Sequence, residues 1–273
     1  MKKIRIGVIG AGWWATFAHL PAIKSHPDAE LVAVQSREPA KAERIARDLG
    51  AKHACTSVEE LLAFEELDAV IVASTPNVHF AQAKAALHSG RHVLLEKPMT
   101  FTADEARELV ELAAKKQLQL LISCPWHFTP HGIEARRLIQ AGALGEIKMI
   151  SVLMTNPVDN LLRGTNTSPT HGARKFYVEP CRGSYSDPAI AGGGQIYCQV
   201  SHAAAYLTFL TGVAWDHRRR PRNFSLPSSR TSAYCQPRLS APWAWPGACR
   251  DWVSLWIMHT LPAREFPTRA SNR

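Results

Sequence analysis

The feature that most constrains the fold is a glycine-rich turn close to the N-terminus. Residues 4–9 read IRIGVI, and GAGWWA at 10–15 follows directly, ahead of a segment of helical length. This is a G-x-G-x-x-A pattern between a strand and a helix, the setting in which the pattern indicates dinucleotide binding. Gly10 would permit the tight turn, and Gly12 would let the backbone approach a pyrophosphate at the helix N-terminus. The pattern predicts a strand, a turn and a helix, with a kink expected at Pro21.

The first 123 residues alternate short apolar runs with segments of helical length. The runs read IRIGVI (4–9), LVAVQS (31–36), AVIVAS (69–74), HVLL (92–95) and LQLLIS (118–123). Runs of this kind, rich in Val, Ile and Leu, indicate a parallel sheet that is covered by helices on both faces. One intervening segment begins with Thr102 and Glu105, which have the spacing of a capping box. We predict an α/β fold with a Rossmann-type, doubly wound parallel sheet over 1–123.

A second domain is expected after this sheet, because the pattern changes near residue 145. EIKMISVLMTN at 146–156 predicts a strand of a different sheet, and the residues that follow are rich in Pro, Gly, Ser and Thr. A glycine run, an apolar segment of helical length and Gly212 then occupy 192–212. This order predicts a helix that ends at a C′ glycine.

Residues 215–273 differ in composition from the rest of the chain and read as an irregular basic tail. They hold ten arginines and three acidic residues, so most of the formal charge of +9 lies there, together with five of the eight tryptophans. They show no sustained helical or strand period. Basic, tryptophan-rich sequence can bind nucleic acid or membranes, but we favour a shifted reading frame or an aberrant terminus and expect neither partner. Sequencing of the coding DNA tests this hypothesis.

The cysteines and the apolar runs bear on the compartment and on metal binding. The cysteines lie far apart and form no C-x-x-C pair, so they predict neither a zinc site nor a disulfide framework. No apolar run reaches the roughly 18 residues of a membrane helix. We therefore expect a reduced, cytoplasmic protein without a bound metal. The cysteines are Cys55, Cys124, Cys181, Cys198, Cys235 and Cys249.

The end of the second apolar run bears on the choice of cofactor. An acidic residue there would bind the 2′-hydroxyl of an adenosine ribose, whereas a cation can hold a 2′-phosphate. The sequence has Ser36 and Arg37 at this place, with Lys41 four residues after Arg37. A hydroxyl and a guanidinium favour NADP over NAD. Glu38 is the counter-argument, since a small change in the path of the loop would bring its carboxylate to the ribose.

Two further motifs follow the runs at 69–74 and 92–95. TPNVH occupies 75–79, and Glu96, Lys97 and Pro98 follow the second run. Ligands of open α/β sheets lie outside the carboxyl ends of the strands, so both motifs are expected to meet the cofactor. The residues predicted to bind it are Gly10, Gly12, Trp13, Trp14, Ser36, Arg37, Thr75, Pro76, Asn77, His79, Glu96 and Lys97.

These motifs together resemble the Gfo/Idh/MocA family of NAD(P)-dependent oxidoreductases, which includes glucose-fructose oxidoreductase and inositol dehydrogenase. The resemblance covers about 1–213 and also rests on AGALGEI at 141–147 and on GGG before a helical histidine. It implies a Rossmann domain followed by a domain with a large, mostly antiparallel open sheet that binds substrate and pairs protomers. A complete family member would continue this sheet well beyond residue 214, and the tail supplies no credible strands for it, so we expect an incomplete α+β domain over 124–214. The resemblance also implies redox chemistry on sugars, polyols or related carbonyl compounds.

The resemblance further implies which residues act on the substrate. Family members use the lysine of EKP close to the nicotinamide, which gives Lys97 this role, and its ammonium could polarise a carbonyl or stabilise an alkoxide. Glu96 would orient it. The histidine after GGG gives His202 the role of acid/base, but the carboxylates that support it in many relatives are replaced here by Cys198 and Ala205. Candidate substitutes for them are Tyr185, Tyr197 and Gln195.

We predict an NADP-preferring oxidoreductase, with NAD as the alternative cofactor, that transfers hydride between nicotinamide and a hydroxyl or carbonyl carbon of a sugar, polyol or related small molecule. Residues 126–128 stand where many relatives place an arginine before an aromatic, which argues against the familiar polyols. Two alternatives stay open: a non-catalytic NAD(P)-binding sensor, and an inactive product of a frameshifted gene. A homo-oligomer is expected if the second-domain sheet is complete.

Overall fold

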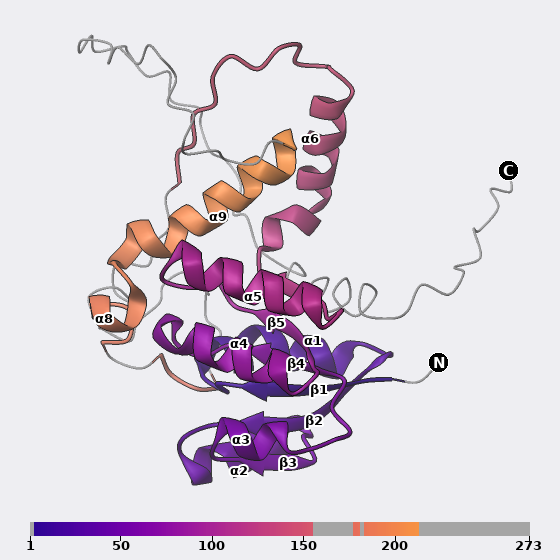
Figure 1. Cartoon of the computed structure of the whole chain (residues 1–273), viewed down its shortest axis with the longest axis vertical. Coiled ribbons are helices and arrows are strands. Elements are labelled where there is room, and N and C mark those ends of the chain that lie inside the picture. The colour runs from indigo at the N-terminus through magenta and orange to yellow at the C-terminus, as the bar shows by residue number, and fades with distance from the viewer. Residues whose placement is uncertain (1–2, 155–176, 181–182, 213–273) are drawn as a thin grey trace, which may run out of the picture.

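A parallel sheet of six strands lies at the centre of residues 4–122 (Figure 1). The computed structural model describes residues 3–154, 177–180 and 183–212, except for the side chains of 194–196. The strand order is β3-β2-β1-β4-β5-β6, the doubly wound order that reverses direction between β1 and β4 and places ligands there. The predicted α/β fold is therefore confirmed. The strands are β1 (Ile4–Ile9), β2 (Ala29–Gln35), β3 (His53–Cys55), β4 (Ala69–Val72), β5 (His92–Leu95) and β6 (Leu120–Ile122).

The helices begin and end largely where the sequence predicts. Thr102 accepts a hydrogen bond from the backbone of Glu105 and the Glu105 side chain accepts one from Thr102, so the predicted capping box is present. Near Pro21 the first helix is a π-helix rather than a kinked α-helix. The helices are η1 (π, Ala15–His19), α1 (Leu20–Ser25), α2 (Pro39–Leu49), α3 (Val58–Leu62), η2 (3-10, Pro76–Val78), α4 (His79–His88), α5 (Ala103–Lys115), η3 (3-10, Pro125–Phe128), α6 (Pro130–Gln140), α8 (Pro188–Ala191) and α9 (Gly194–Thr211).

Each face of the sheet has its own hydrophobic core, because successive strand residues point to opposite faces. On one face, Ile6 and Ile71 belong to a cluster that includes residues of α1 and α2. On the other face, Val70 and Val72 belong to a cluster that includes residues of α3, α4 and α5. Burial on both faces explains why these strands read as continuous apolar runs, and it leaves the carboxyl ends of the strands for binding.

The helices after the sheet pack on one another through rings. α6 and α9 lie together above the sheet (Figure 1), and Trp126 of η3 contacts Tyr206 of α9 edge-on, with ring centroids 5.8 Å apart. α9 is attached to the first domain by Tyr197, whose hydroxyl donates to the carbonyl oxygen of Thr100 at 2.9 Å. Gly212 ends α9 in the left-handed conformation, with φ of 72°, as expected for a C′ glycine.

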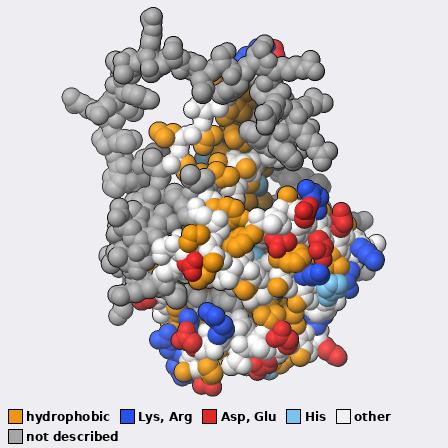
Figure 2. Space-filling view, turned by 60° about the vertical axis from the view of Figure 1, so that its left-hand side comes forward, with side chains coloured by type: hydrophobic (Ala, Val, Ile, Leu, Met, Phe, Trp, Pro, Cys, Tyr) orange, Lys and Arg blue, Asp and Glu red, His pale blue; other side chains and the backbone are white. Residues whose placement is uncertain are grey.

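The strand predicted at 146–156 does not form within 146–154, the part that the structure describes. A strand needs a neighbouring backbone for its hydrogen bonds, and in the described ranges no strand lies beside it. Met149 and Leu153 are exposed at 83% and 91%, and Figure 2 shows hydrophobic side chains gathered above the more highly charged part that contains the sheet. The expected frameshift at 215–273, and Cys181, Cys235 and Cys249, lie outside the described residues.

None of the helices in the described ranges is both long enough and apolar enough to cross a membrane. Cys55, Cys124 and Cys198 are buried free thiols.

Candidate active site at the carboxyl edge of the sheet

The turn after β1 is built as the sequence predicts for a dinucleotide site. Gly10 has φ of +79°, and a Cβ there would lie 2.6 Å from the backbone of Ser74, so the end of β4 closes directly over the turn. The side chain of Gln35 braces the turn, since its Oε1 accepts from the Gly10 amide at 3.1 Å and its Nε2 donates to the Thr56 carbonyl. A Cβ at Gly12 would meet no atom nearer than 3.8 Å. The turn therefore leaves open space at Gly12, which suits a pyrophosphate.

The residues predicted to select the cofactor follow β2. Ser36 is buried at 7% exposure and its Oγ accepts from the Glu38 amide, whereas Arg37 is exposed. The Glu38 carboxylate is 3.5 Å from the ammonium of Lys41, and its side chain is 75% exposed. Glu38 thus faces a cation on its own helix. This edge presents a hydroxyl, a guanidinium and an ammonium, which are groups that suit a phosphate.

His79 joins the two predicted motifs to each other. Its Nδ1 lies 2.8 Å from the carbonyl oxygen of Pro98, and its Nε2 lies 3.1 Å from that of Ser74. The side chain is 1% exposed, and burial lowers its pKa. Because both ring nitrogens face backbone carbonyls, His79 holds the ends of β4 and β5 together, and its contact with the cofactor stays a prediction. Thr75, Pro76 and Asn77 precede it at the accessible edge.

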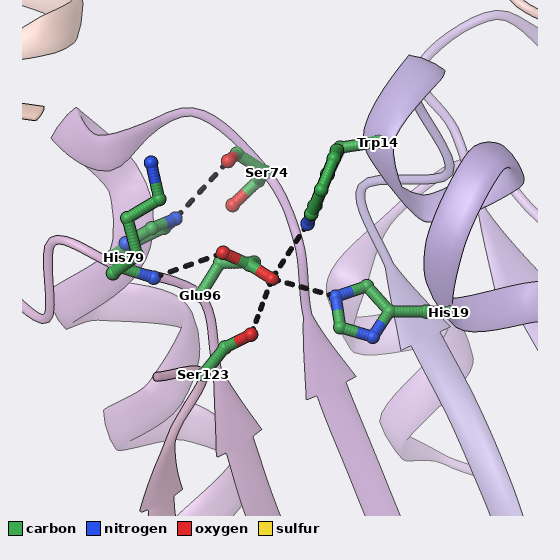
Figure 3. Close-up of polar contacts among 7 residues, drawn as sticks. Trp14, His19, Ser74, His79, Glu96 and Ser123 are labelled. Carbon is green, nitrogen blue, oxygen red and sulfur yellow. Dashed lines mark hydrogen bonds and ion pairs between the residues drawn. The ribbon is translucent and has the colours of Figure 1, made fainter. Parts of the chain in front are cut away.

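Glu96 lies at the centre of a buried hydrogen-bond network (Figure 3). Its Oε1 accepts from Trp14 Nε1 at 2.8 Å, from His19 Nε2 at 2.8 Å and from Ser123 Oγ at 2.6 Å. Its Oε2 accepts from the backbone amide of Lys97 at 3.1 Å. Burial alone would raise the pKa of this carboxyl, but the hydrogen bond and charge of His19, with smaller contributions from Lys97 and Ser123, lower the pKa to about 2.

Glu96 is 6% exposed, and both of its oxygens accept hydrogen bonds from the protein. These bonds suit Glu96 to hold the residues of the site in place, and its contact with the cofactor stays a prediction. It orients Lys97 through the peptide N–H rather than through a bond to the ammonium. The predicted cofactor residue Trp14 likewise directs its indole N–H at Glu96, which leaves its ring face for other contacts.

The two predicted catalytic residues interact electrostatically, since the charge of Lys97 acts on His202. Lys97 follows β5 and is half-buried, and His202 lies on α9 with its ring stacked on Trp126 at 5.2 Å. Burial first, and then the charge of Lys97, lower the pKa of His202 to about 4. His202 is therefore neutral at working pH and able to accept a proton, as a general base requires. Cys198, which stands in place of a carboxylate, is buried, and burial raises its pKa.

The candidate substitutes for the absent carboxylates differ in their surroundings. The hydroxyl of Tyr197 donates to the carbonyl oxygens of Thr100 and Phe101, so it is occupied by backbone. Tyr185 meets the predicted cofactor residue Trp13 edge-on, with ring centroids 6.3 Å apart, and burial raises its pKa. The side chain of Gln195 lies outside the described residues. Tyr185 is thus the substitute that lies against the glycine-rich turn.

Three residues of the site were not among the candidates read from the sequence. His19 and Ser123 bind Glu96, and Trp126 stacks on His202. In the sequence, His19 could have been noticed as a histidine within an apolar helix, and Ser123 as a hydroxyl at the end of an apolar run. Neither pattern predicts that Glu96 is the partner, because the two contacts span 77 and 27 residues of sequence.

The sequence of the chain is similar to those of known oxidoreductases. Residues 4–123 match the GFO_IDH_MocA profile, an oxidoreductase family with an NAD-binding Rossmann fold. The chain is 33% identical over 212 residues to the oxidoreductase sll0816 of Synechocystis sp., covering 78% of this chain and 52% of that protein. It is 38% identical over 161 residues to the dTDP-3,4-didehydro-2,6-dideoxy-alpha-D-glucose 3-reductase of Saccharopolyspora spinosa, covering 57% and 47%.

The fold of the chain is also similar to that of a solved reductase structure. KijD10, a 3-ketoreductase from Actinomadura kijaniata in complex with NADP and TDP-benzene, is similar with a TM-score of 0.50 and 31% identity over 54% of this chain and 45% of that chain. The chain spans about half the length of the curated relatives it matches. Through the Rossmann sheet, the glycine-rich turn and the paired strand-end motifs, residues 4–123 form an NAD-binding domain of the Gfo/Idh/MocA oxidoreductase family.

Proposed function

We propose that the chain is an NADP-preferring oxidoreductase that transfers hydride between nicotinamide and a hydroxyl or carbonyl carbon of a sugar-like molecule. The observation that carries this proposal is the convergence of the glycine-rich turn, closed by Ser74, with the strand end on which Glu96 holds the amide of Lys97. His202 is within electrostatic reach of Lys97, whose charge lowers the pKa of His202. A cation and a neutral base at the carboxyl edge of a Rossmann sheet are suited to moving a proton while hydride moves. The cofactor domain would comprise 1–123, the partial substrate domain 124–214 and the irregular tail 215–273.

The residues present allow a consistent mechanism. Nicotinamide, when bound, supplies or accepts the hydride. The ammonium of Lys97 would stabilise negative charge on the substrate oxygen. In the oxidative direction the neutral His202 would take the hydroxyl proton. In the reductive direction it would first bind a proton from solvent and then donate that proton to the substrate oxygen. The residues suited to hold the cofactor are Gly10, Gly12, Trp13, Ser36, Arg37, Thr75, Pro76 and Asn77.

The relatives support the substrate class and the cofactor. KijD10 was solved with NADP and a TDP-containing ligand, and the Saccharopolyspora spinosa enzyme is a reductase of a dTDP-linked sugar. We therefore infer a sugar or nucleotide-sugar ketone as the substrate, acted on in a reducing, cytoplasmic setting. A homo-oligomer would need the rest of the second-domain sheet.

One observation favours a second candidate, a non-catalytic NADP(H) sensor. The positions that would support His202 hold Cys198 and Ala205 rather than carboxylates. A sensor would bind NADPH and turn over no substrate. Consumption of NADPH in a screen of keto sugars, aldoses and TDP-linked keto sugars would exclude this candidate.

The cofactor preference is tested by replacing Ser36 with aspartate. In the unaltered protein NADPH should raise the melting temperature more than NADH does, because a ligand that binds only the native state stabilises it. In Ser36→Asp the new carboxylate should repel the 2′-phosphate and bind the 2′-hydroxyl, so the NADPH shift should shrink below the NADH shift. A preference for NADPH that persists in Ser36→Asp would remove Ser36 as the selector.

Gly12→Ala tests whether the turn holds a pyrophosphate. The added Cβ meets no protein atom within 3.8 Å, so the melting temperature without ligand should stay within about 2 °C. The same Cβ would occupy space that a pyrophosphate needs, so the Kd for NADPH should rise at least roughly tenfold. Fluorescence titration of NADPH measures it. An unchanged Kd would place the cofactor elsewhere.

A further inference from the structure

Glu96 gathers hydrogen bonds from three separate parts of the cofactor domain. Trp14 and His19 reach it from the first helix, Ser123 from the end of β6, and the Lys97 amide from the end of β5 (Figure 3). The indole and the amide can only donate, so the group that they meet is an acceptor. The carboxylate therefore ties the glycine-rich turn to the strand end that carries Lys97.

All of these hydrogen-bond donors are needed to stabilise the ionised Glu96, because its carboxylate is buried. Removing an ionised carboxylate from water is costly unless its lone pairs are satisfied. Here Glu96 is 6% exposed, and His19, which faces it at 2.8 Å, is 4% exposed. Loss of one donor would leave a buried charge less well compensated, and such a group responds by taking up a proton more readily.

The π-helix explains how two donors from one helix reach the same oxygen. Trp14 and His19 are five residues apart, and in a regular α-helix they would point about 140° apart. In η1 the Leu20 amide donates to the Ala15 carbonyl, the i→i+5 bond of a π-turn, and this wider turn brings residues five apart closer to the same side of the helix than an α-helix does. The local irregularity thus places the His19 imidazole and the Trp14 indole on Glu96 together.

We propose that His19 is a positioning residue: its hydrogen bond completes the set through which Glu96 holds the Trp14 turn and the Lys97 peptide in one fixed arrangement. This inference rests on the proposed function only where it concerns hydride transfer. The network itself is a property of the cofactor domain. His19 touches neither substrate nor cofactor in this scheme and acts through Glu96.

The proposal has a definite dependence on pH. The pKa of Glu96 lies well below its ordinary value, so the carboxylate stays ionised and keeps its hydrogen bonds as the pH falls through the acidic range. Without His19 the pKa of Glu96 should rise, and the network should be lost at a higher pH. The other titratable groups that interact with Glu96 are Lys97, His79, Cys124, Tyr185 and His202.

The test uses the full chain labelled with ¹⁵N-tryptophan, in which Trp14→Phe identifies the Trp14 indole resonance. The variants are His19→Leu, which has no donor, His19→Gln, which keeps a side-chain N–H, and Ser123→Ala, which removes another donor to the same oxygen. In His19→Leu the acid transition of this resonance should lie about one to two pH units above that of the unaltered protein. Ser123→Ala should move it in the same direction, and His19→Gln should move it less than His19→Leu.

A control and a second measurement separate this inference from the proposed function. His88→Leu makes the same change at an exposed histidine of α4 and should leave the resonance unmoved. NADPH titration should give a Kd within about threefold for His19→Gln. Where the screen finds a substrate, the acid limb of the kcat profile of His19→Leu should move to higher pH by about the same one to two units as the indole transition.

The proposal is overturned if the indole resonance of His19→Leu follows that of the unaltered protein at every pH. If His19→Leu does not fold, an unmoved transition in Ser123→Ala overturns it instead. Failure of the unaltered protein to bind NADPH would refute the proposed function while leaving the indole measurement decisive for the network.

Discussion

Replacement of Lys97 by methionine is expected to lower kcat by a factor of roughly 10²–10³ while leaving the Kd for NADPH within about threefold. Methionine keeps much of the length and apolar bulk of lysine and removes the charge that would stabilise the substrate oxygen. Lys97 is half-buried and its backbone amide is held by Glu96, so the substitution removes the charge at a backbone position that stays fixed. Steady-state and fluorescence measurements give the two constants.

The same variant has a readout that needs no substrate. The charge of Lys97 contributes to lowering the pKa of His202 to about 4, after burial, so removal of that charge should raise the pKa of His202. NMR titration of the imidazole measures the change. Lys24→Met, at an exposed site of α1, is the matched control and should alter neither kcat nor the pKa of His202. An undiminished kcat in Lys97→Met would exclude Lys97 from the chemistry.

Gly10→Ala is expected to destabilise the cofactor domain by about 3 kcal/mol or more and to abolish the NADPH-induced rise in melting temperature. The alanine would have to adopt φ of +79°, and its Cβ would lie 2.6 Å from Ser74 Cα and N, which are backbone atoms that cannot move without shifting the end of β4. Denaturant unfolding followed by tryptophan fluorescence measures the loss of stability.

Gly50→Ala separates the two causes of that loss of stability, which are the strain of a positive φ and the close contact with Ser74. Gly50 caps α2 with φ of +82°, nearly the same conformation, but a Cβ there meets nothing within 4 Å. Its substitution should therefore cost only the conformational strain, about 1 kcal/mol, and leave NADPH binding intact. If the two variants lose equal stability, the contact between the turn and Ser74 contributes nothing.

Much of the first domain follows from local signals. Burial on both faces of the sheet produces apolar runs, and the capping box of Thr102 and Glu105 marks the start of α5. Strands and caps could therefore be predicted from short windows of sequence. β3 lacks such a signal, because three residues carry no measurable period and the strand exists through its pairing with Ala33–Gln35 of β2. The opposite error occurred at 146–154, where an apolar pattern found no neighbouring strand.

In the candidate site, too, local motifs predicted which residues matter, and tertiary contacts decided what they bind. Lys97 and His202 were predicted from motifs, and their mutual influence appears only when α9 is placed over the end of β5. His79 and Glu96 were assigned to the cofactor because of their motifs. The structure instead occupies their polar atoms with Ser74, Pro98, Trp14, His19, Ser123 and the Lys97 amide.

The sequence by itself determined the class of fold, the place of the glycine-rich turn and the edge of the sheet at which chemistry can occur, because each depends on residues close together in the chain. Only the tertiary structure decided what each polar side chain at that edge does. Hydrogen bonds depend on distances of about 3 Å between groups that lie 19 to 82 residues apart, and no local pattern encodes such a distance. Glu96 is the clearest case: its motif predicts a ligand residue, and the four donors to its buried carboxylate make it the group that holds the edge together.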